Sequence, residues 1–243
     1  MGQWAAVFDF DGTLTPKSYI SLFNVVEQGA LSEKHIREMH LLRAEYMPKA
    51  IQGTITREEE LDWMIKSIGV FVDARTTLEQ IEMALEKVVL RDGVVECFKE
   101  LRSRGVRVAV ISFGIAQFVR AALRNNGALR LVDEIYATQL NLSARGGVVV
   151  GFKRDTLLLP KDKGIASLAF AKKFGIPENR ILAVGDTLVD ACLGGLKENR
   201  FGIAENERQL DNIREVMGEA VITRDFAPVR NWLLAKIQNS KGA

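Results

Sequence analysis

Residues 4–15 read WAAVFDFDGTLT, an apolar run that ends in two aspartates, a glycine and two threonines. A short run of this kind is typical of a strand in a parallel sheet, and we expect a strand over residues 4–10. Asp9 and Asp11 are two positions apart and therefore point to the same face of that strand. They stand at its carboxyl end, where open parallel sheets bind their ligands.

Similar apolar runs recur along the chain, and helical patterns separate them. The further strands are expected at residues 106–111, 134–138, 181–184, 200–203 and 220–222. The intervening helices are expected at residues 93–104, 115–126, 162–174, 188–197 and 228–238. This alternation predicts an α/β fold with a doubly wound, Rossmann-like parallel sheet.

Residues 18–90 break the alternation, because they contain helical patterns with no strand between them. The expected helices are 18–28, 32–47 with a kink or break at Pro48, 57–68 and 78–89. We therefore expect residues 18–90 to form an inserted helical module. A second, smaller insertion is a predicted hairpin of residues 140–142 and 148–152.

Polar groups also follow two later strands of the predicted sheet. Ser112, Phe113 and Gly114 come after the second strand, and Asp186 comes after the fourth. Three carboxylates at one sheet edge would repel one another, and a hard divalent cation with oxygen ligands resolves the conflict. Mg²⁺ is the usual choice where water and a substrate phosphate complete the ligand set. The backbone amides near Asp11 and Phe113 are candidates to face phosphate oxygens.

Several of these residues also have ordinary structural explanations. Ser112 has the chemistry of a helix N-cap, a role that is compatible with anion binding at the same helix end. Lys163, at the start of a predicted helix, is a candidate phosphate ligand, and the nearby Lys161 is its rival. Asp190 either orients Lys163 or a metal-bound water, or it caps the helix that follows.

The composition limits the partners and the compartment. The chain has 243 residues with 33 Lys and Arg against 31 Asp and Glu, a net charge of +2, so nothing indicates nucleic acid or an anionic membrane as a partner. Cys97 and Cys192 form no CxxC motif, and no apolar stretch reaches the roughly 18 residues of a membrane helix. We therefore expect a cytoplasmic protein.

The ordered motifs resemble the haloacid dehalogenase superfamily, and within it the phosphatase branch. The matching positions are residues 9–15, Ser112, Lys163, and Gly185-Asp186 with Asp190, and Lys163 lies 23 residues before Asp186. The resemblance covers nearly the whole chain. It implies a core domain of residues 1–17 and 91–243 and an α-helical, C1-type cap domain of residues 18–90.

The resemblance implies a role for each of these positions. It implies that Asp9 is the nucleophile and Asp11 the acid and base. It also implies that Mg²⁺ is bound by Asp9, the Asp11 carbonyl and Asp186, and that Ser112 and Lys163 complete the charge balance around the phosphate. A phosphomonoesterase that acts on a small phosphorylated substrate through an aspartyl-phosphate is the leading hypothesis. A phosphomutase or phosphotransferase, and a non-catalytic phosphate-binding module, are the alternatives.

The layout resembles that of phosphoserine phosphatases most closely, yet two positions depart from their pattern. Those enzymes carry a glutamate at the position of Ser18 and a cap arginine where an ungapped match places Met64. Without these two charges, phosphoserine would lose two charge-assisted contacts of roughly 1.5 to 3 kcal/mol each. We therefore expect a phosphate ester of a less polar or uncharged alcohol to be the better substrate.

Overall fold

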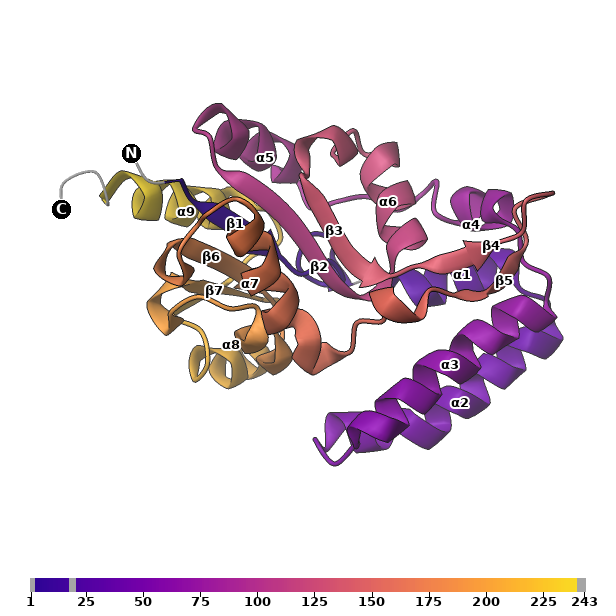
Figure 1. Cartoon of the computed structure of the whole chain (residues 1–243). Helices are drawn as coiled ribbons and strands as arrows, with labels where there is room; N and C mark the ends of the chain where they lie inside the picture. Colours follow the sequence, from indigo (N-terminus) through magenta and orange to yellow (C-terminus); the bar gives the residue numbers. More distant parts are fainter. Residues whose placement is uncertain (1–2, 18–20, 240–243) are drawn as a thin grey trace.

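A six-stranded sheet forms the centre of the molecule in the computed structural model, which describes residues 3–17 and 21–239. The strand order is β3-β2-β1-β6-β7-β8, and all five strand pairings are parallel (Figure 1). The strands are β1 (Ala5–Phe8), β2 (Arg107–Ile115), β3 (Glu134–Thr138), β6 (Ile181–Gly185), β7 (Arg200–Ala204) and β8 (Glu219–Ile222).

The order of the strands places a switch point between β1 and β6. From β1 the chain adds β2 and β3 on one side, and from β6 it adds β7 and β8 on the other. The register pairs Phe8 with Val184, so these two strands end side by side. In open α/β sheets the crevice at such a point is where ligands bind.

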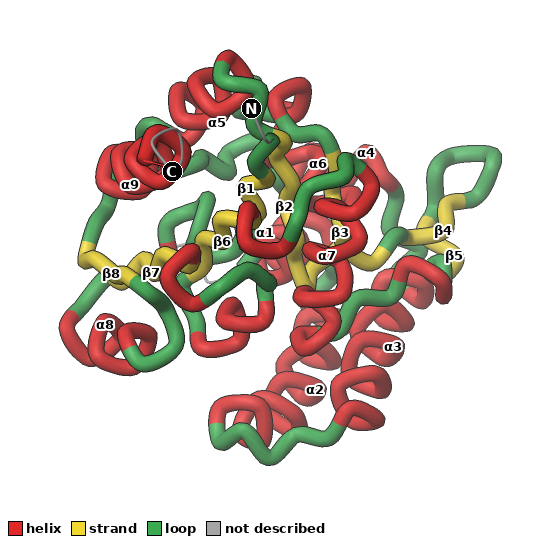
Figure 2. The backbone as a smooth tube through the Cα atoms, turned by 60° about the vertical axis from the view of Figure 1, so that its left-hand side comes forward, coloured by secondary structure: helices red, strands yellow, loops and turns green. Residues whose placement is uncertain are grey.

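Helices cover both faces of the sheet. Ala6 and Phe8 of β1 pack with α5 (Val94–Ser103) and α9 (Ala227–Asn239), where the Phe8 and Phe98 ring centroids are 5.0 Å apart. The alternate residues Ala5 and Val7 pack with α7 (Lys163–Lys173). In Figure 2, α9 lies above the strands and α8 (Glu207–Arg214) below them. The α/β, doubly wound fold class is therefore confirmed.

Four helices follow β1 before the chain returns to the sheet. They are α1 (Leu22–Ala30), α2 (Glu33–Ile51), α3 (Arg57–Asp73) and α4 (Leu78–Ala84). α1 contacts both α4 and α6 (Ala116–Asn125). The ring centroids of Phe23 in α1 and Phe118 in α6 are 5.5 Å apart. α2 and α3 instead form an antiparallel pair that extends away from the sheet (Figure 1).

The predicted hairpin is present and contacts the inserted helices. It consists of β4 (Leu140–Leu142) and β5 (Val149–Phe152), which pair in antiparallel fashion. The amide of Val149 donates to the carbonyl of Thr76 at 2.8 Å, and the amide of Leu78 donates to the carbonyl of Gly147 at 3.0 Å. The turn between α3 and α4 is thus attached to this hairpin.

Arg91 marks the point where the chain re-enters the sheet layer. Its amide donates to the carbonyl of Leu14 at 2.8 Å, so the two connections to the inserted helices are adjacent. Its buried guanidinium donates to the carbonyls of Gly12 and Thr223 and to Glu205, each at 2.9 Å. One side chain therefore joins the loops that follow β1, β7 and β8.

Four helix predictions were wrong in extent. α3, expected to end at residue 68, continues to Asp73. α2 continues through Pro48 to Ile51, so the helix does not end at the proline as expected. The helix expected over 78–89 ends at Ala84. The helix expected over 188–197 is a 3₁₀ turn of Leu188–Cys192, since Gly194 and Gly195 adopt positive φ angles of 83° and 72°.

Two further differences concern the ends of the predictions. α8 was not predicted, because its sequence ERQLDNIR has only two apolar residues. The start of the helix expected at 18–28 falls partly on residues 18–20, outside the described residues, and α1 begins at Leu22. No helix in the described part of the chain is long and apolar enough to span a membrane.

Candidate active site

The loop after β1 turns tightly and carries Asp9 and Asp11 to the switch point. The amide of Asp9 continues the sheet by donating to the carbonyl of Val184 at 3.0 Å. The chain then folds back, and the amide of Leu14 donates to the carbonyl of Phe10 at 2.9 Å. Gly12 sits in this turn with φ +80°, and a Cβ there would lie 2.5 Å from Asp186 Oδ2. A glycine is required both by the turn and by the close approach of Asp186.

Three buried carboxylates meet at this place. Asp9, Asp186 and Asp190 each offer an oxygen within 4.8 Å of the others, and we call them the carboxylate cluster. The buried Thr13 hydroxyl lies between two of them, 3.3 Å from Asp9 Oδ2 and 3.1 Å from Asp186 Oδ1. Lys17 places its Nζ 2.9 Å from Asp186 Oδ2. Sequence reasoning quoted Thr13 within the motif but did not assign it a place in the site.

Lys163 is the buried cation of the cluster. It is the first residue of α7, and its Nζ donates to Asp9 Oδ1 at 2.6 Å and to Asp190 Oδ1 at 2.7 Å. Burial alone would lower the pKa of Lys163, but the charges of Asp190 and Asp9 outweigh it and hold that pKa well above its usual range. Lys161 is exposed and lies in the 3₁₀ turn Pro160–Asp162, just before α7 begins. Of the two candidate lysines, Lys163 is the one in the cluster.

Asp190 uses both of its oxygens within the protein. Oδ1 accepts from Lys163, while Oδ2 accepts from the amides of Asp186 at 3.1 Å and Thr187 at 2.9 Å and from the Thr187 hydroxyl at 2.7 Å. Asp190 thus orients Lys163 and also forms a capping box with Thr187 at the start of the 3₁₀ turn. Both of the structural roles considered from the sequence are present together.

Asp11 points to a different part of the site. Its Oδ1 accepts from the amide of Leu22, the first residue of α1, at 2.9 Å. Burial raises the pKa of Asp11 to about 6. A Cβ built at Gly114 would lie 3.9 Å from Asp11 Oδ2 and 3.2 Å from Ser112 Oγ, so Asp11 Oδ2 faces the corner formed by these residues.

The segment Ser112-Phe113-Gly114 belongs to the end of β2 and not to a helix start. β2 continues to Ile115, and Ile115 is the N-cap residue of α6, so the N-cap interpretation of Ser112 was wrong. The Ser112 hydroxyl instead accepts from the amide of Gly114 at 3.0 Å and is itself buried. Between Ile111 and Ile115 the register of β2 with β3 shifts.

The carboxylate cluster has the chemistry of a hard divalent cation site. Burial raises the pKa of Asp9, against the opposing charge of Lys163, and burial likewise raises the pKa of Asp186. Two buried carboxylates with a shared hydroxyl neighbour are therefore costly unless more positive charge is present. Asp190 Oδ2 already accepts three hydrogen bonds, whereas each oxygen of Asp9 and Asp186 has one partner, so Asp9 and Asp186 are the carboxylates that fit such a cation.

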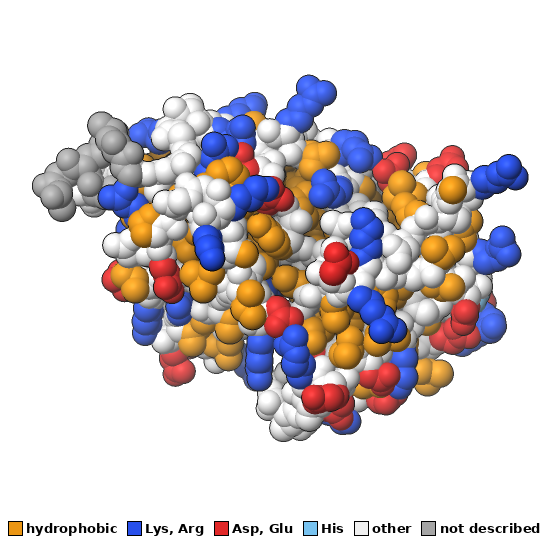
Figure 3. Space-filling view, viewed as in Figure 1, with side chains coloured by type: hydrophobic (Ala, Val, Ile, Leu, Met, Phe, Trp, Pro, Cys, Tyr) orange, Lys and Arg blue, Asp and Glu red, His pale blue; other side chains and the backbone are white. Residues whose placement is uncertain are grey.

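A cavity of about 450 Å³ lies over these groups. Asp9, Asp11, Ser112, Lys163 and Asp186 line one side of it. In Figure 3, hydrophobic side chains gather between the part of the molecule that holds the sheet and the α2–α3 pair. The other side, which we call the helical wall, consists of Met39, Arg43 and Met47 of α2 and Glu60, Trp63, Met64 and Ser67 of α3.

The helical wall follows from helix periodicity. Its α2 members recur every four residues, and its α3 members recur at spacings of three and four, so each set shares one helix face. Met64 lines the cavity, at the position where relatives were expected to place an arginine. Arg43 of α2 also lines it, and sequence reasoning missed this residue, although its place midway between Met39 and Met47 was a usable signal. Ser18 lies outside the described residues.

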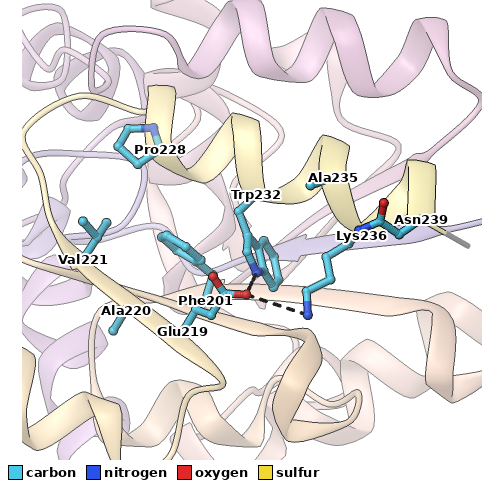
Figure 4. A pocket seen from close by; sticks show the side chains of 9 residues that line it. All are labelled: Phe201, Glu219, Ala220, Val221, Pro228, Trp232, Ala235, Lys236 and Asn239. Carbon is cyan, nitrogen blue, oxygen red and sulfur yellow. Dashed lines mark hydrogen bonds and ion pairs between the residues drawn. The ribbon is translucent and has the colours of Figure 1, made fainter.

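A second hollow, of about 610 Å³, lies between β7, β8 and α9 (Figure 4). Glu219 accepts from the Trp232 indole at 2.7 Å there and lies 3.8 Å from Lys236 Nζ. None of the residues that line it belongs to the carboxylate cluster. The chemistry suggested by the sequence is therefore confined to the cavity at the switch point.

Comparison with known proteins gives the chain a family. The family model of haloacid dehalogenase-like hydrolases matches residues 5–192. A phosphoserine phosphatase of Methanocaldococcus jannaschii is 27% identical over 194 residues, which cover 79% of this chain and 82% of that protein.

Two solved structures share the fold. Cytosolic 5′-nucleotidase IIIB bound to cytidine has a TM-score of 0.80 at 19% identity, covering 98% of this chain and 87% of the other. A phospho-aspartyl intermediate analogue of phosphoserine phosphatase has a TM-score of 0.69 at 21% identity, covering 96% and 100%. The chain therefore belongs to the haloacid dehalogenase-like hydrolase family, as a phosphatase-type enzyme built like the phosphoserine phosphatases.

Proposed function

We propose that this protein is a Mg²⁺-dependent phosphomonoesterase that transfers the phosphoryl group of a small ester to Asp9 and then to water. The observation that carries the proposal is the bridge of Lys163 between Asp9 and Asp190, with Asp186 in the same buried cluster. This arrangement holds a carboxylate nucleophile at the switch point and supplies positive charge beside it.

The cation would be held by Asp9, Asp186 and the backbone carbonyl of Asp11. When bound, it supplies positive charge that offsets the charge of the substrate phosphate and of the nearby carboxylates. Lys163 keeps the Asp9 carboxylate in place by donating a hydrogen bond to its Oδ1 atom. Ser112, Phe113 and Gly114, at the end of β2, are the proposed contacts of the remaining phosphate oxygens.

The proposed reaction has two steps that use Asp9 and Asp11 in turn. In the first, a carboxylate oxygen of Asp9 forms a bond to phosphorus, the bond from phosphorus to the ester oxygen breaks, and the leaving alcohol takes a proton from Asp11. In the second, Asp11 removes a proton from water, the water oxygen bonds to phosphorus, and the bond to Asp9 breaks. Inorganic phosphate and the free alcohol are the products.

Asp11 is suited to the proton transfers by its surroundings. Burial raises its pKa to about 6, so both protonation states are accessible near neutral pH. The Leu22 amide occupies Oδ1, which leaves Oδ2, on the side of Gly114 and Ser112, to carry the proton. The acid therefore faces the proposed phosphate pocket.

We further propose that residues 18–90 act as a cap domain over a core of residues 1–17 and 91–243. The helical wall lies across the cavity from the carboxylate cluster, so it is placed to exclude water and to contact the leaving alcohol. A cavity of about 450 Å³ is in the range of small-molecule sites, which supports a small substrate.

The test is turnover of a panel of phosphate monoesters with and without added Mg²⁺, followed by trapping of the phosphorylated enzyme with borohydride. Reduction of an aspartyl-phosphate yields homoserine, which mass spectrometry should locate at position 9 and not at position 11. Release of inorganic phosphate to water supports a phosphatase. Transfer to an added sugar in place of water would instead identify a phosphotransferase, and homoserine at neither position would refute the proposed intermediate.

A further inference from the structure

The helical wall contains one aromatic ring whose orientation is fixed by its neighbours. The Trp63 indole stacks on the Tyr46 ring, with centroids 5.8 Å apart and planes at 13°. Tyr46 is buried, its hydroxyl donates to Asp62, and Lys66 Nζ donates to that hydroxyl at 2.8 Å. Because the plane of Trp63 is set before any ligand arrives, a ligand that stacks on it loses little ordering entropy.

The rest of the wall is mainly apolar and adaptable in shape. Met39 and Met64 are buried in it, Met47 lies at its edge, and Phe23 of α1 lines the same cavity. Methionine side chains fill irregular gaps and make favourable contacts with aromatic rings. An alcohol as small and polar as serine would leave these surfaces without a partner.

The charged residues of the wall differ in how far they are already engaged. Arg43 pairs with Glu27 of α1, which is fully buried, and His40 Nε2 lies 3.3 Å from the same carboxylate. The charge of Arg43 is thus largely offset within the protein, which makes it a weak partner for a carboxylate on the substrate.

Glu60 is in the opposite situation. It is only 9% exposed, and among the described residues no side chain donates a hydrogen bond to it. Its cationic neighbours are Lys161, which is exposed, and Arg57, three residues earlier in α3, whose guanidinium is held by Asp162 at 2.8 Å. Glu60 lies on the same face of α3 as Trp63, three residues before it, so both side chains reach one part of the cavity.

Resting on the phosphomonoesterase function proposed above, we infer that the helical wall selects phosphate esters of alcohols that carry a flat aromatic ring. Trp63 is the platform on which the ring stacks. Glu60 accepts a hydrogen bond from a donor or a positive charge on that ring. Phosphoserine offers its ammonium group to Glu60, but it has no ring for Trp63 and it brings a carboxylate that Glu60 repels, so it is the poorer match for the wall.

The experiment compares two esters that differ only in the ring. Benzyl phosphate and cyclohexylmethyl phosphate release similar primary alcohols, so their chemistry on Asp9 and Asp11 is matched. An aromatic pair is worth about 0.5 to 1.5 kcal/mol, so kcat/KM should favour benzyl phosphate by roughly 2- to 13-fold. Trp63→Leu should bring the ratio close to one, and Trp63→Phe, the matched control, should keep most of the preference.

Glu60 is tested with a second pair of esters. Glu60→Gln should lower kcat/KM for 4-(aminomethyl)benzyl phosphate by roughly tenfold relative to benzyl phosphate, because it removes a charge-assisted hydrogen bond. The same preferences should appear as dissociation constants measured by calorimetry with Asp9→Asn and Mg²⁺, where no turnover is needed. Melting temperatures of all variants show whether each remains folded.

The outcomes separate this inference from the function on which it rests. Equal kcat/KM for the two ring esters in the natural protein, or a ratio that Trp63→Leu leaves unchanged, overturns the inference while the phosphatase function stands. A kcat/KM for phosphoserine above that of both ring esters overturns it as well. Absence of hydrolysis of every ester, together with retained binding preference, refutes the phosphatase function and supports the aromatic platform.

Discussion

The two sides of the cavity are built on different principles. On the side of the sheet, Asp9, Lys163 and Asp190 are buried and joined by hydrogen bonds of 2.6 and 2.7 Å, so each one fixes the next. On the side of the helical wall, most side chains are apolar and rest on helix faces. Chemistry at phosphorus requires fixed atoms, whereas recognition of an alcohol needs mainly shape and surface. We therefore expect variants of the two sides to fail in different ways.

The largest expected effect is that of Asp9→Asn. The amide keeps the shape of the side chain but cannot form the bond to phosphorus, so turnover should fall by at least about 1,000-fold for every ester alike. Steady-state rates on several esters, beside a thermal melt, provide the measurement. A loss that depended on the alcohol would contradict the division between the two sides.

Removal of divalent metal should come next in size. A chelator should stop hydrolysis and added Mg²⁺ should restore it, because the carboxylate cluster and a phosphate dianion repel each other. Asp186→Ala should raise the Mg²⁺ concentration needed for half-maximal rate more than Asp190→Ala does, as Asp190 uses its oxygens within the protein. Unaltered activity in excess chelator would rule out the proposed metal role.

Lys163 and Lys161 form a matched pair on the sheet side. Lys163→Met leaves Asp9 and Asp190 without their buried cation and should reduce the free energy of unfolding by about 3–5 kcal/mol, along with activity. Lys161→Met changes an exposed side chain and should leave both nearly unchanged. Denaturant titration of the two variants gives the comparison, and similar losses in both would argue against the assignment of Lys163.

Asp11→Asn should divide substrates by their leaving group. Alkyl phosphates, whose alcohols need a proton to leave, should lose about 100-fold or more in kcat/KM. Aryl phosphates, with better leaving groups, should lose markedly less. Rates on an alkyl and an aryl ester of similar size test this, and equal losses on both would remove Asp11 from the role of acid.

Glu27→Gln should have the smallest effect and should act only through the helical wall. It frees the charge of Arg43, so kcat/KM for phosphoserine should rise a few-fold relative to benzyl phosphate, a change worth about 1 kcal/mol. The rate on a small ester such as methyl phosphate serves as the control, since it does not reach the wall. A change in that control rate would show that Glu27 affects the carboxylate cluster.

The difference between the two sides also decided what the sequence could predict. Asp9, Asp11 and Asp186 follow apolar runs, and parallel strands bring their carboxyl ends together, so their arrival at one cavity followed from local pattern. The third carboxylate of the cluster, however, is Asp190 and not Asp11. The choice between Lys161 and Lys163 required the position at which α7 begins. The spacing of Met39, Arg43 and Met47 marks one face of α2, but the pairing of Arg43 with Glu27 required the packing of α2 beside α1, which no pattern within either helix specifies.

The errors in the predicted secondary structure also came from contacts that local sequence patterns do not specify. The sequence after Asp186 resembles a helix, but the 3₁₀ turn ends at Cys192 because Gly194 and Gly195 follow it. A Cβ at Gly195 would lie 2.6 Å from the carbonyl oxygen of Ile181, so this segment must pass close to β6. Contacts between segments that are distant in sequence overrode the local preference.

The hydrogen bond between Arg91 and Leu14 has an evolutionary consequence. The chain leaves the sheet body and returns to it at neighbouring points, so the excursion between them imposes no spacing on the strands around it. The length and sequence of the segment between Leu14 and Arg91 can therefore change in evolution while β1 and β6 keep their register. Lineages that descend from one such ancestor are free to diverge in the alcohol they accept and still inherit the same chemistry at phosphorus.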